Sequence, residues 1–301
     1  MRKHWMLGCA SAVLACALTA AGCGGAPDAA KEAEPAAGVE TAAVPAAPAS
    51  TVVEQATPAT QGQSGEPAER PPGGGTIKGR ISLAGRPPGN PIIRMGADPL
   101  CSRINRGTQV VQEAVLNTAD GGLANVFVKL DGSFPQSPVP TTPVTVDQRG
   151  CTYGPRVVGV RVGQILAVQN SDALMHNVHG ISTTGNGFNV SQPKAGMVQT
   201  FTMMGEETML RLRCDVHTWM TGYVGVVSHP YFAVSSADGT FEITGVPAGT
   251  YTIRTWHERY GELTQTVDVT TGAMTNVDIG YTGDEEPPTA GLQELHVPAL
   301  S

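Results

Sequence analysis

Twelve short runs of strand-forming residues between positions 76 and 270 constrain the fold of this 301-residue chain more than any other feature. The runs are rich in Val, Ile and Thr and are separated by Gly, Pro, Asn and Asp, as strands joined by turns are. We therefore predict an all-β fold, and because one sandwich holds about seven to nine strands, two sandwiches. The runs cover residues 76–85, 124–130, 143–148, 157–163, 164–170, 176–181, 198–203, 208–214, 222–228, 239–246, 249–256 and 264–270.

The N-terminus has the features of an export signal: Arg2 and Lys3, an apolar stretch over 5–21, and small residues before Cys23. The run AAGC at 20–23 resembles the cleavage box of bacterial lipoproteins. This resemblance implies a signal peptide over 1–22, a lipid on Cys23, and anchoring in the cell envelope at the outer membrane, facing the periplasm or the surface. An ordinary secretory signal is the alternative.

Two segments flank the predicted folded region. Residues 23–75 are rich in Ala, Pro and Glu and poor in bulky apolar side chains, so we expect a disordered tether. Residues 282–301 are expected to form a flexible tail. The region between them, 76–281, holds fifteen basic and fifteen acidic residues, and this balance gives no indication of nucleic-acid binding.

The cysteines are informative because export places the protein in an oxidising compartment. Of the six cysteines, two lie in the predicted signal and Cys23 would carry the lipid, which leaves Cys101, Cys151 and Cys214. We predict a disulfide between Cys101 and Cys151, with Cys214 kept for another purpose. A second metal site is the alternative use of the pair.

The run CDVHTWM at 214–220 predicts a copper site. Alternation along 208–214 points Cys214 inward at the end of a strand, and His217 and Met220 follow on the turn. Thiolate, imidazole and thioether are the donors of a His₂Cys copper site with a weak axial Met. A second imidazole must come from elsewhere, and His176 and His179 are the candidates, on opposite sides of an extended segment.

Residues 144–228 resemble a cupredoxin, the blue-copper sandwich of plastocyanin, pseudoazurin and amicyanin, and we predict a cupredoxin domain over 144–231. The resemblance implies one mononuclear type 1 copper, with His176, Cys214 and His217 in plane and Met220 axial. It also implies that Asn177 joins the ligand loops and supports the sulfur's hydrogen bonding. The matching residues are Tyr153, Pro155, Gly163, Asn170, His176, Asn177, Cys214, His217, Met220 and Gly222.

This resemblance implies electron transfer rather than catalysis, because four protein ligands leave no open position for a substrate. A c-type cytochrome or a periplasmic dehydrogenase would be the redox partner, and Trp219 would either join an apolar docking patch around an exposed His217 or pack in the core.

Copper carriage or storage is the alternative within the metal class. Zinc competes for two His and one Cys, but Met is a poor zinc ligand.

Residues 239–258 resemble the carboxypeptidase-regulatory, transthyretin-like sandwich, also known as carbohydrate-binding-like. We predict this domain over 76–131 plus 232–281, interrupted by the cupredoxin, with strand 76–85 in one sheet with strand 249–256; a simple tandem is the alternative. The resemblance adds a glycan-binding or adhesive protein as another function, although no row of aromatics supports it. His257 is expected to be an exposed structural histidine. The matching residues are Asp238, Gly239, Phe241, Val246, Pro247, Gly249 and Tyr251.

Overall fold

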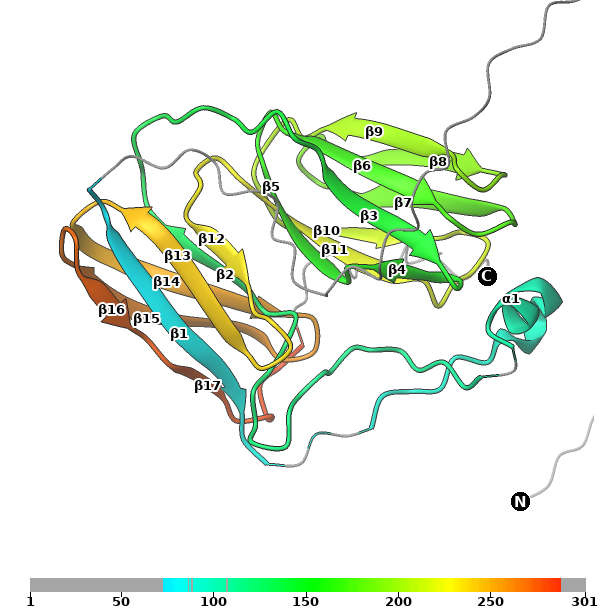
Figure 1. Cartoon of the computed structure of the whole chain (residues 1–301), viewed down its shortest axis with the longest axis horizontal. Coiled ribbons are helices and arrows are strands. Elements are labelled where there is room, and N and C mark those ends of the chain that lie inside the picture. The colour runs from blue at the N-terminus through cyan, green and yellow to red at the C-terminus, as the bar shows by residue number, and fades with distance from the viewer. Residues whose placement is uncertain (1–72, 86, 88, 107, 288–301) are drawn as a thin grey trace, which may run out of the picture. The chain divides into compact units, whose positions relative to one another are not determined.

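The computed structural model describes residues 73–287 except 86, 88 and 107. The all-β prediction is confirmed: the regular secondary structure of these residues consists of strands, apart from the short helices η1 (Met95–Ala97) and α1 (Pro99–Ile104) (Figure 1). The predicted signal peptide, Cys23, nearly all of the tether and most of the tail lie outside the described residues. Within them, no helix is long and apolar enough to cross a membrane.

One pair of sheets is built from the two ends of the described region. Strands of both sheets contribute to a single apolar core, which includes Ile77, Leu130, Ile243 and Ile253. The first sheet holds β1 (Gly75–Leu83), β13 (Thr240–Val246), β16 (Met274–Asn276) and β17 (Ile279–Tyr281). The second runs in the order β12 (Phe232–Val234), β2 (Phe127–Asp131), β14 (Gly249–His257) and β15 (Gly261–Val269).

The predicted placement of strand 76–85 in one sheet with strand 249–256 is wrong. β1 pairs with β13, whereas β14 lies between β2 and β15 in the other sheet. The Val-Pro-x-Gly turn carries the chain from one sheet to the other, so β13 and β14 do not pair as a hairpin. Strands from before and after the interruption still pair directly, as Figure 1 shows for β1 beside β13. The division into two domains stays a prediction.

A second pair of sheets encloses a second core, which includes Val146, Leu166, Leu210 and Leu212. Every strand predicted in this region is present. One sheet has the order β5 (Val157–Arg161), β11 (Thr221–Val227), β10 (Glu207–Arg213), β7 (His176–Ile181) and β8 (Phe188–Gln192). The other has β4 (Thr152–Gly154), β3 (Val144–Arg149), β6 (Ile165–Asn170) and β9 (Val198–Thr202).

The segment between β1 and β2 was not predicted to contain a helix. α1 is only six residues long, too short for a helical pattern to stand out, and it is capped by Asp98, whose carboxylate accepts from the N–H groups of Leu100 and Cys101. The predicted disulfide is confirmed: Cys101 of α1 is bonded to Cys151, in the turn between β3 and β4. The disulfide therefore holds α1 against the second pair of sheets.

The two pairs of sheets meet through aromatic side chains. Phe127 and Phe232 lie against strands β5 and β11 at two glycines, because a Cβ on Gly225 would come within 2.5 Å of the Phe127 ring and one on Gly159 within 2.3 Å of the Phe232 ring. Met209, on the outer face of β10, is buried in the same contact. The predicted alternation along 208–214 is thus correct, although the face of β10 that carries Met209, Arg211 and Arg213 is only partly exposed to solvent.

A buried ion pair also joins the two pairs of sheets. Both charged side chains are nearly buried, with Arg156 11% and Glu258 9% exposed, and the pair is bidentate. Removal of one partner leaves the other charge buried and uncompensated, so we expect Arg156→Met to lower the free energy of unfolding by about 3 kcal/mol. The double variant Arg156→Met/Glu258→Met should recover most of that loss in urea unfolding. Equal destabilisation by single and double variants would contradict this.

The stability of the protein should depend on pH through His229, which is 6% exposed and packs against Phe134. Burial lowers its pKa to about 4, as do Lys129 and Arg161, against the opposing effect of Glu206. Because the folded-state pKa lies below the ordinary value of 6.5, His229 stabilises the fold above pH 6.5 and this contribution is lost as the pH falls toward 4. The loss amounts to about 3 kcal/mol.

The measurement is urea unfolding at pH 7.5 and at pH 4.5, with His229→Phe as the comparison. Phenylalanine keeps a ring next to Phe134 but cannot bind a proton. The variant should therefore lose less stability between the two pH values than the wild type. A pH dependence that is identical in the two proteins would rule out His229 as its source.

Candidate metal centre

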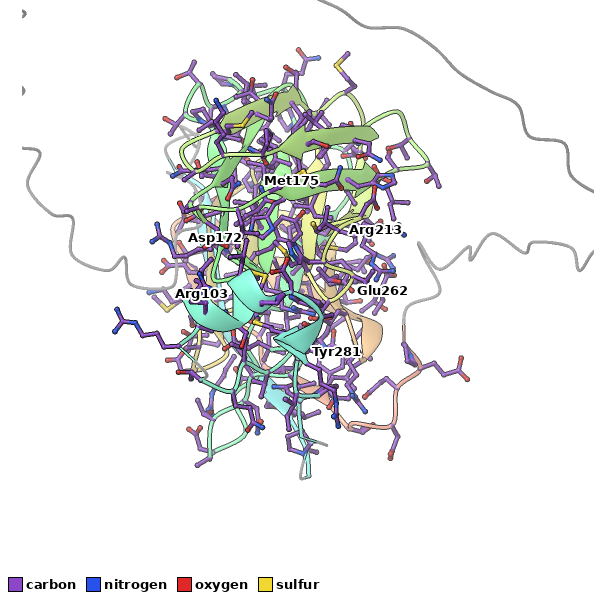
Figure 2. All side chains as sticks on the ribbon, turned by 90° about the vertical axis from the view of Figure 1, so that its right-hand side faces the viewer. Arg103, Asp172, Met175, Arg213, Glu262 and Tyr281 are labelled. Atoms are coloured by element: carbon purple, nitrogen blue, oxygen red, sulfur yellow. A yellow bond between two sulfur atoms is a disulfide. The ribbon has the colours of Figure 1, made fainter. Side chains whose placement is uncertain are left out.

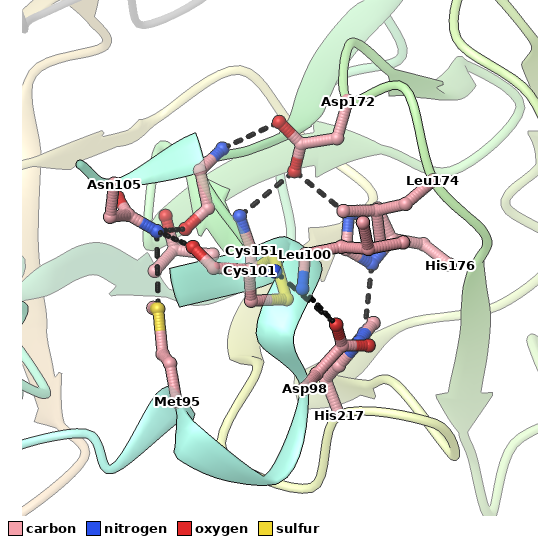
Figure 3. Close-up of a disulfide and its surroundings, with 12 residues drawn as sticks. Met95, Asp98, Leu100, Cys101, Asn105, Cys151, Asp172, Leu174, His176 and His217 are labelled. Atoms are coloured by element: carbon pink, nitrogen blue, oxygen red, sulfur yellow. Dashed lines mark hydrogen bonds and ion pairs between the residues drawn. A yellow bond between two sulfur atoms is a disulfide. The ribbon is translucent and has the colours of Figure 1, made fainter. Parts of the chain in front are cut away.

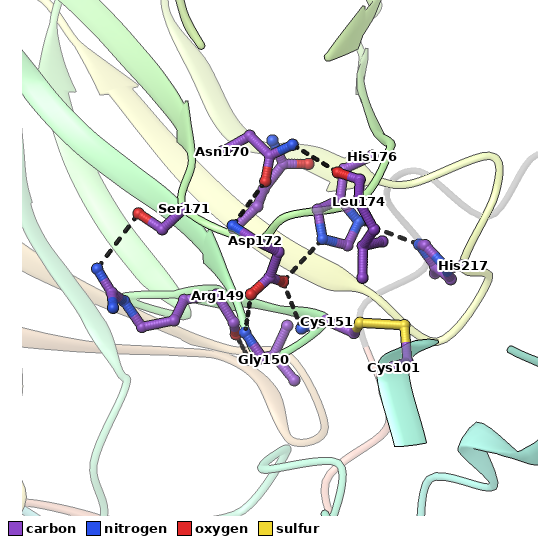
Figure 4. Close-up of polar contacts among 12 residues, drawn as sticks. Cys101, Arg149, Gly150, Cys151, Asn170, Ser171, Asp172, Leu174, His176 and His217 are labelled. Carbon is purple, nitrogen blue, oxygen red and sulfur yellow. Dashed lines mark hydrogen bonds and ion pairs between the residues drawn. A yellow bond between two sulfur atoms is a disulfide. The ribbon is translucent and has the colours of Figure 1, made fainter. Parts of the chain in front are cut away.

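Two loops at one end of the second pair of sheets bring the predicted ligands together. His176 is the first residue of β7, and Cys214 directly follows β10. His217 and Met220 lie in the connection from β10 to β11. All four side chains are buried, with exposures of 0% for His176 and 1% for each of the other three. Figure 2 views the end of the protein that carries α1, and Figure 4 shows the two imidazoles close together.

The three strongest donors form one cluster. Ligand atoms of His176, Cys214 and His217 all lie within 4.8 Å of one another. The two Nδ1 atoms are 3.0 Å apart, and the Cys214 sulfur lies 3.7 Å from Nδ1 of His217. The structure thus brings together residues that are about 40 positions apart in the sequence. It places His176 in the cluster and leaves His179 outside it.

Each imidazole contacts a carboxylate through Nε2, the ring nitrogen that does not belong to the cluster. Nε2 of His176 lies 2.8 Å from Asp172 (Figures 3 and 4), and Nε2 of His217 lies 3.0 Å from Asp98 (Figure 3). A carboxylate only accepts hydrogen bonds, so each Nε2 carries the proton and each Nδ1 turns a lone pair toward the cluster. Burial opposes the negative charge of Asp172, but its bond from His176 lowers its pKa, and the bond from His217 lowers that of Asp98.

The donor set fits a single metal ion. Two Nδ1 lone pairs that face each other at 3.0 Å repel unless a proton or a metal cation lies between them. Metal–ligand bonds of about 2.0 to 2.3 Å separate the donors around one ion by about 3 to 4 Å, which matches the observed spacing. Imidazole nitrogen and thiolate sulfur suit copper or zinc rather than calcium or magnesium.

The Cys214 sulfur is prepared to act as a thiolate. Burial alone would raise the pKa of this thiol, but the neighbouring His176 and backbone N–H groups bring the pKa down to about 7. The N–H of Asn177 donates to the sulfur at 3.4 Å and that of His217 at 3.3 Å. These bonds come from both ligand loops, so the sulfur also fixes one loop against the other.

Asn177 and Tyr153 connect the two loops further. The Asn177 side chain accepts from the N–H of Asp215 at 3.0 Å and donates to Asn189 at 2.6 Å. The Tyr153 hydroxyl donates to the carbonyl of Asn177 at 2.9 Å and to that of Arg213 at 3.1 Å. The residue after the first predicted ligand therefore spans both loops.

Met220 lies in the same buried cluster as Cys214. Its backbone closes the ligand turn, because its N–H donates to the carbonyl of His217 at 2.9 Å and its carbonyl accepts from the N–H of Cys214 at 3.4 Å. The axial role of its thioether remains a prediction.

His179 and Trp219 lie beside the cluster. His179 is 31% exposed and contacts Asp215, so it points away from Cys214 as the odd separation predicted. Trp219 is partly buried, its ring centre lies 5.1 Å from that of His217, and its indole N–H donates to the carbonyl of Cys151. The expected exposed edge of His217 is wrong, because Asp98 and Trp219 contact this imidazole and leave it buried.

Asp98 and Asp172 were not predicted as part of the site from the sequence. Asp172 lies four residues before His176, and a carboxylate so close to a predicted ligand was a signal that could have been noticed. Asp98 lies 119 positions from His217 and outside the predicted cupredoxin range, so only the folded chain reveals its contact.

The first pair of sheets offers little aromatic surface on which a sugar could stack. Tyr231, Trp256 and Tyr260 are buried, with exposures of 2%, 3% and 2%, and cannot form a stacking surface. The expected exposure of His257 is also wrong, since its side chain is completely buried. Burial, helped by the charges of Arg156 and Arg259, lowers the pKa of His257 to about 3.

No protein-family model matches the chain, and no curated protein matches it. Parts of the chain resemble solved structures. A novel purple cupredoxin from Nitrosopumilus maritimus is 22% identical, with a TM-score of 0.24 over 27% of this chain and 97% of that one. An oxidized mutant of amicyanin is 24% identical, with a TM-score of 0.25 over 28% of this chain and 81% of that one.

A Cu-containing nitrite reductase, NirK from Thermus scotoductus SA-01, is 21% identical, with a TM-score of 0.27. The similarity covers 32% of this chain and only 24% of the reductase. Because all of these TM-scores are below 0.5, a function has to be derived from the side chains of this protein.

Proposed function

We propose that the protein is a type 1 copper protein that carries single electrons. His176, Cys214 and His217 would hold one copper ion, and Met220 would contribute its thioether as a weaker donor. The observation that carries this proposal is the buried cluster of two imidazole nitrogens and one sulfur within 4.8 Å of one another. A bound copper ion would supply a one-electron couple.

The protein residues would keep the site rigid and dry. Hydrogen bonds from Asn177 and His217 hold the sulfur, and the carboxylates of Asp98 and Asp172 hold the imidazoles. Because donors fixed in this way move little between oxidation states, they favour rapid electron exchange. Complete burial of the ligands keeps substrates and water away from them, which supports a carrier rather than an enzyme.

The partner and the location are part of this proposal. A c-type cytochrome or a periplasmic dehydrogenase would dock near the ligand loops, where the neighbours of two ligands, Met175 and Val216, are 46% and 45% exposed. The export signal and the AAGC box support a lipid anchor on Cys23 in the cell envelope.

The test is metal analysis of the purified protein together with its visible spectrum. We expect one copper per chain and an intense absorption band that disappears on reduction and returns on oxidation. Bound copper without such a band would favour copper carriage or storage. Binding of zinc and exclusion of copper would contradict both functions.

A further inference from the structure

The carboxylate of Asp98 comes from a part of the chain outside the predicted cupredoxin range. Its Oδ1 caps α1 by accepting from the N–H groups of Leu100 at 2.8 Å and Cys101 at 3.3 Å. Its Oδ2 is then free to accept from Nε2 of His217 at 3.0 Å. One carboxylate thus links the start of α1 to a predicted metal ligand.

Asp172 is arranged in a parallel way around the other half of the disulfide. It accepts from the N–H groups of Gly150 and Cys151, both at 2.8 Å, and contacts Nε2 of His176. Each cysteine of the disulfide therefore donates its backbone N–H to the carboxylate that holds a histidine (Figure 3). The chain of contacts is continuous from His176 through Asp172, Cys151, Cys101 and Asp98 to His217.

We propose that Asp98, fixed by the disulfide, is a positioning residue of the metal centre that sets the orientation and donor strength of His217. This inference rests on the proposed copper function. An imidazole that donates Nε2–H to a carboxylate keeps Nδ1 free for the metal and is a stronger electron donor. Because the oxidised ion carries the higher charge, it gains more from such a donor than the reduced ion does.

The test compares Asp98→Asn with the wild type as full-length proteins loaded with copper. Asparagine is as good a helix cap as aspartate, so α1 should stay in place while the negative charge is lost. We expect about tenfold weaker Cu²⁺ binding with almost no change in Cu⁺ binding. A tenfold difference between the two states raises the reduction potential by about 59 mV.

Asp215→Asn is the matched control. Asp215 is next to Cys214 in sequence and loses the same formal charge, but it is bonded to Arg213 and His179 instead. The control should retain a potential closer to that of the wild type. An equal shift in the two variants, or no shift in Asp98→Asn, would overturn the role of Asp98.

A measurement without metal separates this inference from the copper proposal. Long-range ¹H–¹⁵N correlation spectra of the metal-free protein should show His217 with its proton on Nε2, and Asp98→Ala should populate the other tautomer as well. If copper does not bind but the tautomers behave in this way, only the proposed function fails. If copper binds with the expected band but His217 keeps one tautomer in Asp98→Ala, only the inference fails.

Discussion

The Cys214→Ser variant is expected to lose the intense visible absorption of the copper-loaded protein completely. That absorption requires a thiolate bonded to copper, and Cys214 is the one free cysteine within residues 73–287. Its sulfur is buried and accepts two backbone N–H groups, so no other sulfur can take its place without moving both loops. The measurement is the visible spectrum of the oxidised protein together with its copper content.

The matched control for this variant is His179→Ala. His179 lies in the same strand as His176 but is partly exposed and bonded to Asp215. The control should keep both the band and the metal. Retention of the band in Cys214→Ser, or its loss in His179→Ala, would contradict the assignment of the ligands.

Removal of the disulfide is expected to have the largest effect on stability. Cys101 and Cys151 are separated by 50 residues and both are completely buried. A cross-link that closes a loop of this length restricts the unfolded chain, so Cys101→Ala/Cys151→Ala should lower the free energy of unfolding by about 4 kcal/mol. For a folded region of this size, the melting temperature should fall by about 10 °C.

Thermal and urea unfolding of the metal-free protein test this expectation, with and without a dithiol reductant. The reductant should destabilise the wild type but leave the double variant unchanged, because that variant has no disulfide in the folded region. A double variant within 1 kcal/mol of the wild type would show that α1 is held mainly by its other contacts, such as the hydrogen bonds of Asn105 to the carbonyl groups of Cys101 and Gly150.

Local patterns explain why much of the fold could be predicted. Alternation of apolar residues showed every strand of six residues or more but not the five-residue β8, and the period of two placed Cys214 inward and His176 opposite His179. Strands of three residues, such as β12 and β16, were missed because so few residues give no period. The pairing of β1 was wrongly predicted because register and partner depend on where a turn directs the chain.

The sequence by itself determined the kind of donors in the predicted site: Cys214, with His217 and Met220 in fixed register after it, predicts the metal chemistry because ligand type depends on residue identity. Only the tertiary structure decided what surrounds those donors. Asp98 reaches His217 across 119 positions, and Asp98 and Trp219 bury an imidazole that was expected to be exposed. The physical reason is that such contacts depend on where the chain returns in space, and spacing along a sequence carries no information about that.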